Sequence, residues 1–187
     1  KGKAALAQAE AFDPSVANVM SRVKSGTLDG GAKYSYLKKT TRGNSVNMTI
    51  SLPMGSVSTL MNKGDIADLC ASMLERGTEK HNYQQIGDEF DKLKSNVSIS
   101  QNGQSLMVSV QTTKENLKAT IALIEELLRK PIFPASEFEK LKEEELAGIE
   151  SQKSEPQAIA GNVFERLTNN YPKGDFRYAS TFEESAA

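Results

Sequence analysis

Residues Ala67 to Thr78 read ADLCASMLERGT, and this run is the most informative part of the 187-residue chain. Positions 68, 71 and 72 of a helix lie on one face, because residues three and four apart are neighbours on a helical surface. That face carries a carboxylate, a methyl group and a hydroxyl, from Asp68, Ala71 and Ser72. The apolar residues around it recur at helical spacing and predict a helix over residues 65–75 with one buried stripe: Ile66, Leu69, Cys70, Met73 and Leu74.

Alternating apolar and polar residues predict two β-hairpins, one on either side of this helix. Residues 46–52 place an apolar side chain at every second position, which is the period of a strand buried on one face. We expect residues 33–39 and 44–52 to pair around the glycine-containing segment 40–43. A second hairpin is expected around Asn102-Gly103, because a type I′ turn needs positive φ at both central residues.

Capping signals and apolar periodicity predict the remaining helices. The order that results, β-β-α-α-β-β-α-α-α, is an α+β pattern: a mainly antiparallel sheet with helices packed on one face. The expected capping boxes are Asn82/Gln85, Thr112/Glu115 and Ser136/Glu139, and the expected helices cover residues 1–11, 83–94, 112–130, 134–153 and 157–169.

The composition excludes several classes of function. With 23 basic and 24 acidic residues, the net charge is −1, so nothing predicts binding to nucleic acid. No apolar run approaches the roughly 18 residues of a membrane span. The single cysteine, Cys70, excludes an internal disulfide framework. Its place on the apolar stripe predicts a buried, inert thiol.

The chain also has a single histidine, His81. Catalytic zinc usually takes three protein ligands, drawn mainly from histidine, cysteine and carboxylates. A standard zinc site is therefore not expected. An enzyme that uses His81 with Asp68 or Ser72 is one hypothesis, but His81 follows a polar turn, and an exposed loop histidine is the stronger interpretation.

Several short stretches, in their order and spacing, resemble the pitrilysin/insulinase family, which includes the mitochondrial processing peptidases and bacterial zinc peptidases. The resemblance covers nearly the whole chain from about Phe12, and it implies the α+β half-domain fold of those metallohydrolases. It is carried by Leu52–Ser56, Met73–His81, Ile86–Leu93, Thr112–Leu117, Leu127–Pro134, Phe138–Lys142 and Ser154–Pro156.

The resemblance also implies that the zinc site of this family is vacant here. Active half-domains hold zinc through the two histidines of an H-x-x-E-H motif and a glutamate on a later helix. Asp68 and Ser72 take the places of the histidines, and Ala71 takes the place of the catalytic glutamate. The third ligand position falls near Ala147 or Gly148. We therefore expect no catalytic, cofactor-binding or metal-binding residue in this chain.

The chemical consequence of these replacements is large. Bound zinc lowers the pKa of its water from about 15.7 to about 7, and Ala71 offers no general base. Without imidazole partners, the glutamates near the third position are expected to form a solvated helix face: Glu143, Glu144, Glu145 and Glu150.

We expect residues 1–30 to be a lead-in or linker, and residues 31–187 to be one peptidase-like half-domain that is truncated at its C-terminal end. Both ends of the chain are interpreted as cuts in a longer protein. The resemblance implies a non-catalytic domain of a zinc metalloendopeptidase, a scaffold and wall of the peptide-binding chamber. The zinc would lie in a catalytic half-domain of the same chain or of a partner subunit.

The implied partners are that second half-domain and a peptide substrate, with no nucleic acid and no membrane span. A stand-alone structural or assembly subunit without protease activity is the alternative. Exported bacterial relatives favour the periplasm, by analogy alone.

Overall fold

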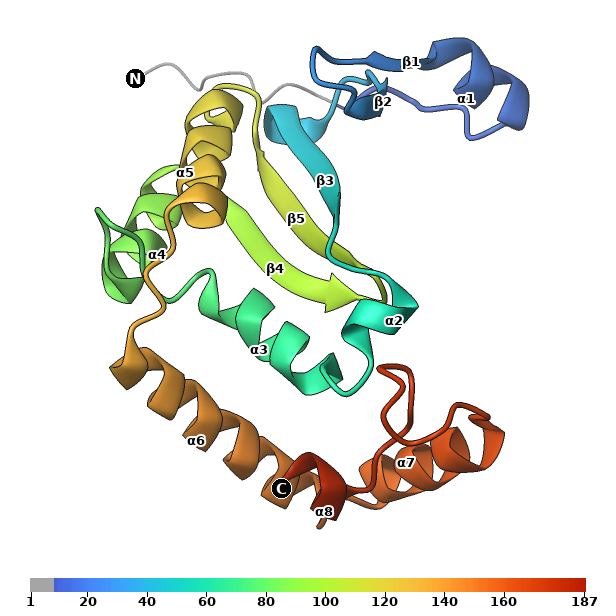
Figure 1. The fold of residues 1–187 in the computed structure, drawn as a ribbon. Coiled ribbons are helices and arrows are strands. Elements are labelled where there is room, and N and C mark those ends of the chain that lie inside the picture. Colours follow the sequence, from blue (N-terminus) through green and yellow to red (C-terminus); the bar gives the residue numbers. More distant parts are fainter. Residues whose placement is uncertain (1–8) are drawn as a thin grey trace.

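The computed structural model describes residues 9–187, and its α+β architecture confirms the predicted fold class (Figure 1). No helix among these residues combines the length and the apolar character that crossing a membrane requires. In chain order the elements are α1 (Val16–Arg22), β1 (Val23–Thr27), β2 (Lys33–Leu37), the 3₁₀ turn η1 (Arg42–Asn44), β3 (Ser45–Pro53), α2 (Val57–Leu60), α3 (Gly64–Met73), α4 (Tyr83–Lys92), β4 (Asn96–Asn102), β5 (Ser105–Thr113), α5 (Leu117–Arg129), α6 (Ala135–Gln152), α7 (Pro156–Thr168) and α8 (Phe182–Ser185).

The central sheet is antiparallel, with β5 between β3 and β4. The predicted hairpin around Asn102-Gly103 is confirmed as β4–β5, but its turn is shifted by one residue. Asn102 pairs with Ser105, so the central residues are Gly103 and Gln104. Gly103 has a φ of 61°, whereas neither Asn102 nor Gln104 has a positive φ. This arrangement matches a type II′ turn, which places glycine at its first central position.

The other predicted hairpin is wrong, because residues 33–39 do not pair with residues 44–52. β3 pairs instead with β5, from Ser45 opposite Thr113 to Pro53 opposite Ser105. The segment between β2 and β3 contains a 3₁₀ turn in which Gly43 and Asn44 both have positive φ. The chain therefore changes direction there without bringing the two strands into register.

β2 pairs with β1 in a separate two-stranded sheet. The connecting turn contains Gly30 and Gly31 at φ values of 95° and 88°, and the Leu28 N–H donates to the Ala32 carbonyl at 2.8 Å. A glycine pair in a short turn is a hairpin signal, and it was missed in the sequence. α1 and β1 therefore lie inside residues 1–30, the predicted lead-in.

The five long helices begin and end close to their predicted positions, except that α5 begins at Leu117 and not at residue 112. The capping box of α4 is confirmed, since Asn82 and Gln85 exchange two hydrogen bonds of 2.9 Å. The other two predicted boxes are wrong: α5 begins after Asn116 and α6 after Pro134, neither with a side-chain cap. Pairing with β3 keeps β5 extended as far as Thr113, which delays the start of α5. Of the helix expected over residues 1–11, residues 9–11 are not helical, and residues 1–8 lie outside the described range.

The hydrophobic core lies between one face of the central sheet and helices α3, α4 and α5. Val108 of β5 and Leu127 of α5 are completely buried, and Ile124 is 1% exposed. The opposite face of the sheet is polar, because Asn47, Thr49, Ser98, Ser109 and Gln111 alternate with the core residues and are exposed. The buried cluster consists of Ala71, Leu74, Ile86, Phe90, Ile99, Leu106, Val108, Val110, Leu123, Ile124 and Leu127.

The buried face of α3 is rotated from the predicted stripe. Met73 and Leu74 are buried as expected, but Ile66 is 64% exposed and Cys70 is exposed. The prediction of a buried Cys70 thiol is therefore wrong. Small residues at helical spacing face the core instead, which allows the helix to approach the sheet closely: Ala67 and Ala71.

Candidate functional site

The three motif positions lie together on α3 but in different surroundings. Ala71 is 1% exposed and belongs to the hydrophobic core, whereas Asp68 is exposed and Ser72 is half-buried. α6 runs beside α3 in the lower part of the molecule (Figure 1). The site is therefore the side of α3 that faces α6, and the core lies on the other side of α3, against the sheet.

Asp68 of α3 lies close enough to Glu145 of α6 for their negative charges to interact. Partial burial raises the pKa of the Asp68 carboxyl, and the negative charges of Asp65 and Glu145 raise it further. Glu145 is three residues before Gly148, so the two positions share a face of α6. The structure thus brings Asp68 toward the part of α6 where the third ligand position was expected.

The side chains at these positions do not fit a zinc ion. Ala147 and Gly148 are exposed on α6, and no heavy atom lies within 4 Å of the place where a Cβ on Gly148 would be. A methyl group at Ala71 and an absent side chain at Gly148 supply no ligand atom, which leaves one carboxylate and one hydroxyl. Within residues 9–187, no three His, Cys, Asp or Glu side chains lie close enough to hold a metal ion.

Arg76 connects the end of α3 to α4 and α6. Its guanidinium lies 2.6 Å from a carboxylate oxygen of Glu144 and 3.8 Å from one of Glu137. It also lies over the Tyr83 ring, 4.6 Å from the ring centre. The Arg76 side chain is only 11% exposed. Glu144 is therefore not simply part of a solvated helix face, as the sequence suggested, although its own side chain is 59% exposed.

Glu75 is a half-buried acid that lies just after the C-terminal end of α3. Burial raises the pKa of its carboxyl to about 7, despite smaller opposing effects from the Ile99 backbone and the Arg76 charge. The α3 helix packs on β4, the strand that contains Ile99. No periodic pattern pointed to Glu75, because it lies between the apolar stripe and the polar turn.

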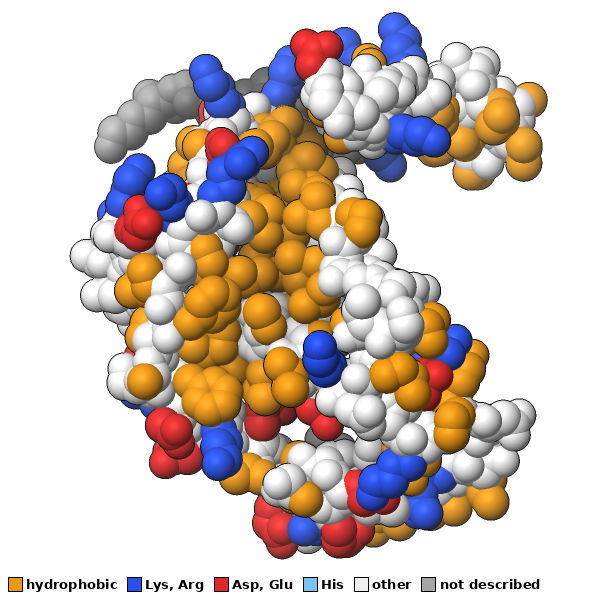
Figure 2. Space-filling model, in the orientation of Figure 1, with side chains coloured by type: hydrophobic (Ala, Val, Ile, Leu, Met, Phe, Trp, Pro, Cys, Tyr) orange, Lys and Arg blue, Asp and Glu red, His pale blue; other side chains and the backbone are white. Residues whose placement is uncertain are grey.

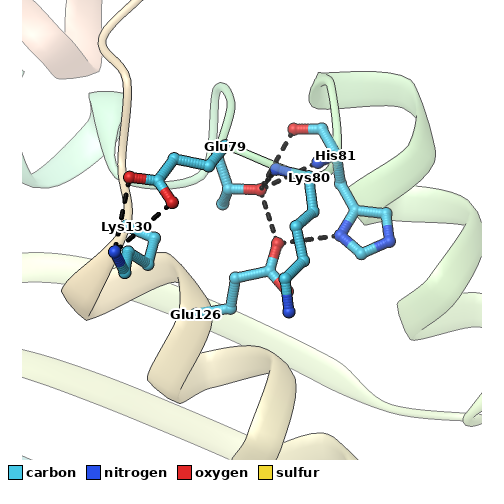
Figure 3. Close-up of polar contacts among 6 residues, drawn as sticks. Glu79, Lys80, His81, Glu126 and Lys130 are labelled. Carbon is cyan, nitrogen blue, oxygen red and sulfur yellow. Dashed lines mark hydrogen bonds and ion pairs between the residues drawn. The ribbon is translucent and has the colours of Figure 1, made fainter.

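His81 belongs to a polar cluster that connects the α3–α4 turn to α5 (Figure 3). Its Nδ1 lies 2.8 Å from Oε1 of Glu126, and the Thr78 hydroxyl donates to the same oxygen at 2.5 Å. Burial raises the pKa of Glu126, but its hydrogen bonds with Thr78 and His81 outweigh that effect and hold it below the ordinary value. The expected exposed loop histidine is thus a partly buried hydrogen-bonding residue.

This cluster does not have the geometry of a nucleophile and a base. The Thr78 hydroxyl bonds to a carboxylate and not to the imidazole, whereas nucleophilic catalysis needs the hydroxyl within hydrogen-bond reach of its base. Among the described residues, neither Asp68 nor Ser72 makes a hydrogen bond with His81. The cluster instead fixes the turn, since the backbone N–H groups of Lys80 and His81 donate to the Thr78 hydroxyl.

A cavity of about 430 Å³ lies away from these residues, near the start of β3 and β4 and the end of β5. Its lining is polar and includes Arg42, Lys94 and Gln111. This hollow is therefore separate from the degenerate α3–α6 site.

Comparison with known proteins identifies the family and the fold of the chain. A family model described as Insulinase (Peptidase family M16) matches residues 35–179. The chain matches no curated protein sequence. Its fold is similar to that of an inactive domain of a peptidase of this family from Pseudomonas fluorescens, with 22% identity and a TM-score of 0.69 over 84% of this chain and 38% of that one.

Two further solved structures share the fold. A protease from Helicobacter pylori has 13% identity and a TM-score of 0.67, over 87% of this chain and 39% of that one. The ferredoxin protease FusC, solved as a mutant in complex with Arabidopsis ferredoxin, has 17% identity and a TM-score of 0.62, over 99% of this chain and 20% of that one.

The chain thus spans less than two fifths of each of these proteins. At such low identities the structures establish a common fold, while the family match extends over most of the chain. The resemblance in the sequence is confirmed, and the chain belongs to the insulinase family of peptidases.

Proposed function

We propose that this chain is a non-catalytic domain of a zinc metalloendopeptidase, and that it serves as scaffold and wall of a peptide-binding chamber beside a catalytic half-domain. The observation that carries this proposal is the set of residue types on α3: the resemblance to the family places Asp68, Ala71 and Ser72 at the positions of the zinc motif. The Pseudomonas fluorescens relative is itself described as an inactive domain. In this proposal, zinc and peptide cleavage belong to another half-domain.

The packing around α3 supports a scaffold role. Arg76 joins this helix to α4 and α6, and Ala71 anchors it in the core. These contacts hold the helix against its neighbours without any metal ligand on it. A helix that is well packed but lacks catalytic residues is compatible with a non-catalytic wall of the peptide-binding chamber.

Metal analysis and a protease assay test the first part of the proposal. The purified chain, freed of any tag, should contain well under one zinc per molecule. It should not cleave an unstructured peptide such as the insulin B chain, with an active zinc peptidase as positive control. Stoichiometric zinc that is lost on Asp68→Ala, or hydrolysis that a chelator abolishes, would overturn the proposal.

The coding sequence around the chain separates the scaffold from the stand-alone subunit. An H-x-x-E-H motif elsewhere in the same polypeptide supports the scaffold beside a catalytic half. If no such motif is encoded there, co-purification with a zinc-containing subunit becomes the test. A complex without any zinc peptidase would favour the structural subunit and contradict the proposal.

A further inference from the structure

An exposed pair of tyrosines lies on the β1–β2 hairpin. Tyr34 and Tyr36 are 42% and 51% exposed, and their rings stack with centres 6.3 Å apart and planes inclined by 22°. Alternate strand residues share a face, and the register places Gly26 opposite Tyr34. A Cβ on Gly26 would lie 2.7 Å from the Tyr34 phenol oxygen. The glycine therefore allows this ring to lie across the neighbouring strand.

Lysines flank the two rings. Lys24 pairs with Tyr36 in the register and so shares its face, and Lys38 follows directly after β2. Both lysines are exposed, and neither takes part in an ion pair among residues 9–187. We use the name Tyr–Lys face for the surface formed by Lys24, Tyr34, Tyr36 and Lys38.

The acids near this hairpin do not neutralise the face. Glu10 pairs with Arg22 at 2.8 Å, and Asp13 accepts a 2.9 Å hydrogen bond from the Ser15 backbone. Asp29 lies in the β1–β2 turn, at the opposite end of the hairpin from Lys38. Figure 2 shows lysine and arginine side chains gathered over the upper part of the molecule, where β1 and β2 lie.

Exposed apolar side chains also lie on α1, the helix that directly precedes the β1–β2 hairpin. Val16 and Met20 of α1 are 78% and 72% exposed, and they are one helical turn apart. Hydrophobic side chains are visible at the outer end of the upper arm in Figure 2, where Figure 1 places α1. No residue of α1 is buried, so this helix packs only lightly on the described part of the chain.

We propose that the Tyr–Lys face docks an acidic segment of a protein partner, with tyrosine rings as contacts and lysines as the charge complement. Tyrosine is enriched at interface hot spots, because it offers a large contact area at a low cost in side-chain entropy. Unpaired lysines at the rim attract carboxylates and set the rate of association. The net charge of the whole chain is −1, which disfavours the alternative of a long phosphate backbone.

Fluorescence anisotropy with two matched probes tests this proposal on the whole chain. The first probe is a fluorescein-labelled decapeptide of alternating glutamate and phenylalanine, and the second has lysine in place of glutamate. The acidic probe should bind saturably in low salt and the basic probe should not. Raising the salt to about 0.5 M should weaken binding severalfold, because exposed charges are screened.

Variants then locate the site. Lys24→Glu with Lys38→Glu should weaken binding of the acidic probe at least about tenfold, and Tyr36→Ala about fivefold or more. Tyr36→Phe should retain most of the affinity and shows that the hairpin itself is intact. Lys142→Glu, an exposed lysine on α6, is the control and should have no effect.

Three results would overturn the proposal. They are no saturable binding of the acidic probe up to about 1 mM, equal affinity of the control and the Lys24/Lys38 variant, and tighter binding of a ten-residue oligothymidylate through the same residues. The last result would assign the face to single-stranded nucleic acid. Because these readouts need neither zinc nor proteolysis, they are independent of the proposed scaffold function.

Discussion

Replacing Arg76 with methionine should lower the free energy of unfolding by about 2–3 kcal/mol. The substitution keeps an unbranched apolar side chain of similar length but removes the guanidinium. The exposed Glu144 carboxylate makes the pair with Arg76 worth about 0.5–1 kcal/mol. The cation–π contact with Tyr83 adds about the same.

The largest loss comes from Glu137. Its side chain is only 15% exposed, and its Oε2 atom is buried without a hydrogen bond. Without Arg76, this carboxylate keeps only Lys140, at 2.7 Å. Leaving a buried group poorly satisfied costs about 1 kcal/mol or more, and the three contributions together give the predicted total.

Urea unfolding followed by circular dichroism measures this loss. With a slope of about 2–3 kcal/mol per molar urea, the midpoint of the Arg76→Met variant should fall by roughly 1 M. Arg129→Met is the matched control, because Arg129 and Glu125 are 74% and 62% exposed and their pair contributes little. If Arg76→Met changes stability no more than Arg129→Met, the reasoning about this connection between helices is refuted.

Three further predictions concern α3 and α6. Glu75 has a pKa of about 7 in the fold against an ordinary 4.5. Its contribution to the free energy of unfolding is therefore fully present below about pH 4.5, where the carboxyl is protonated, and is lost as the pH rises through 7. Glu75→Gln should therefore raise the urea midpoint at pH 8 and leave it unchanged at pH 4.5; an equal shift at both pH values would contradict this. Ala71→Glu should destabilise the fold by about 3–5 kcal/mol, because it buries an unpaired charge in the core, whereas Asp68→Asn should change stability by less than about 0.5 kcal/mol. In a chain that carries Asp68→His and Ser72→His, addition of Gly148→Glu should tighten zinc in a titration, since it supplies the third ligand. A gain from Ala147→Glu instead would shift the register by one residue, and no gain from either substitution would show that the superposition on the zinc motif is wrong.

Helices and the second hairpin could be predicted because their signals are local. Apolar spacing located α3, α4, α5, α6 and α7, and the Asn82/Gln85 box was sufficient to begin α4. The pairing of β3 was not predictable in the same way. A strand can pair with a neighbour along the chain or with a strand far away, and the local sequence does not decide between them. β3 pairs with β5, which is distant in the sequence.

The candidate site shows the same division. The resemblance to the family placed the degenerate motif positions on α3, and this assignment stays a prediction. The burial of Ala71 could not be predicted, because alanine occurs on exposed helix faces as well as on buried ones. The contacts of Arg76 with Glu144 and of His81 with Glu126 join residues far apart in sequence, so no local pattern could reveal them.

The order of strands in the central sheet has a consequence for how the chain folds. β4 and β5 are joined by a two-residue turn, whereas α2, α3, α4 and β4 all lie between β3 and β5 along the chain. Pairing Ser45 with Thr113 closes a long loop, and such contacts form late because their entropic cost comes first. Substitutions in the Gly103 turn should therefore change the rate of refolding, whereas substitutions in β3 should act mainly on the rate of unfolding. Stopped-flow measurements on the two sets of variants would place β3 as the last strand to join the sheet, and so as the strand that limits the kinetic lifetime of the native state.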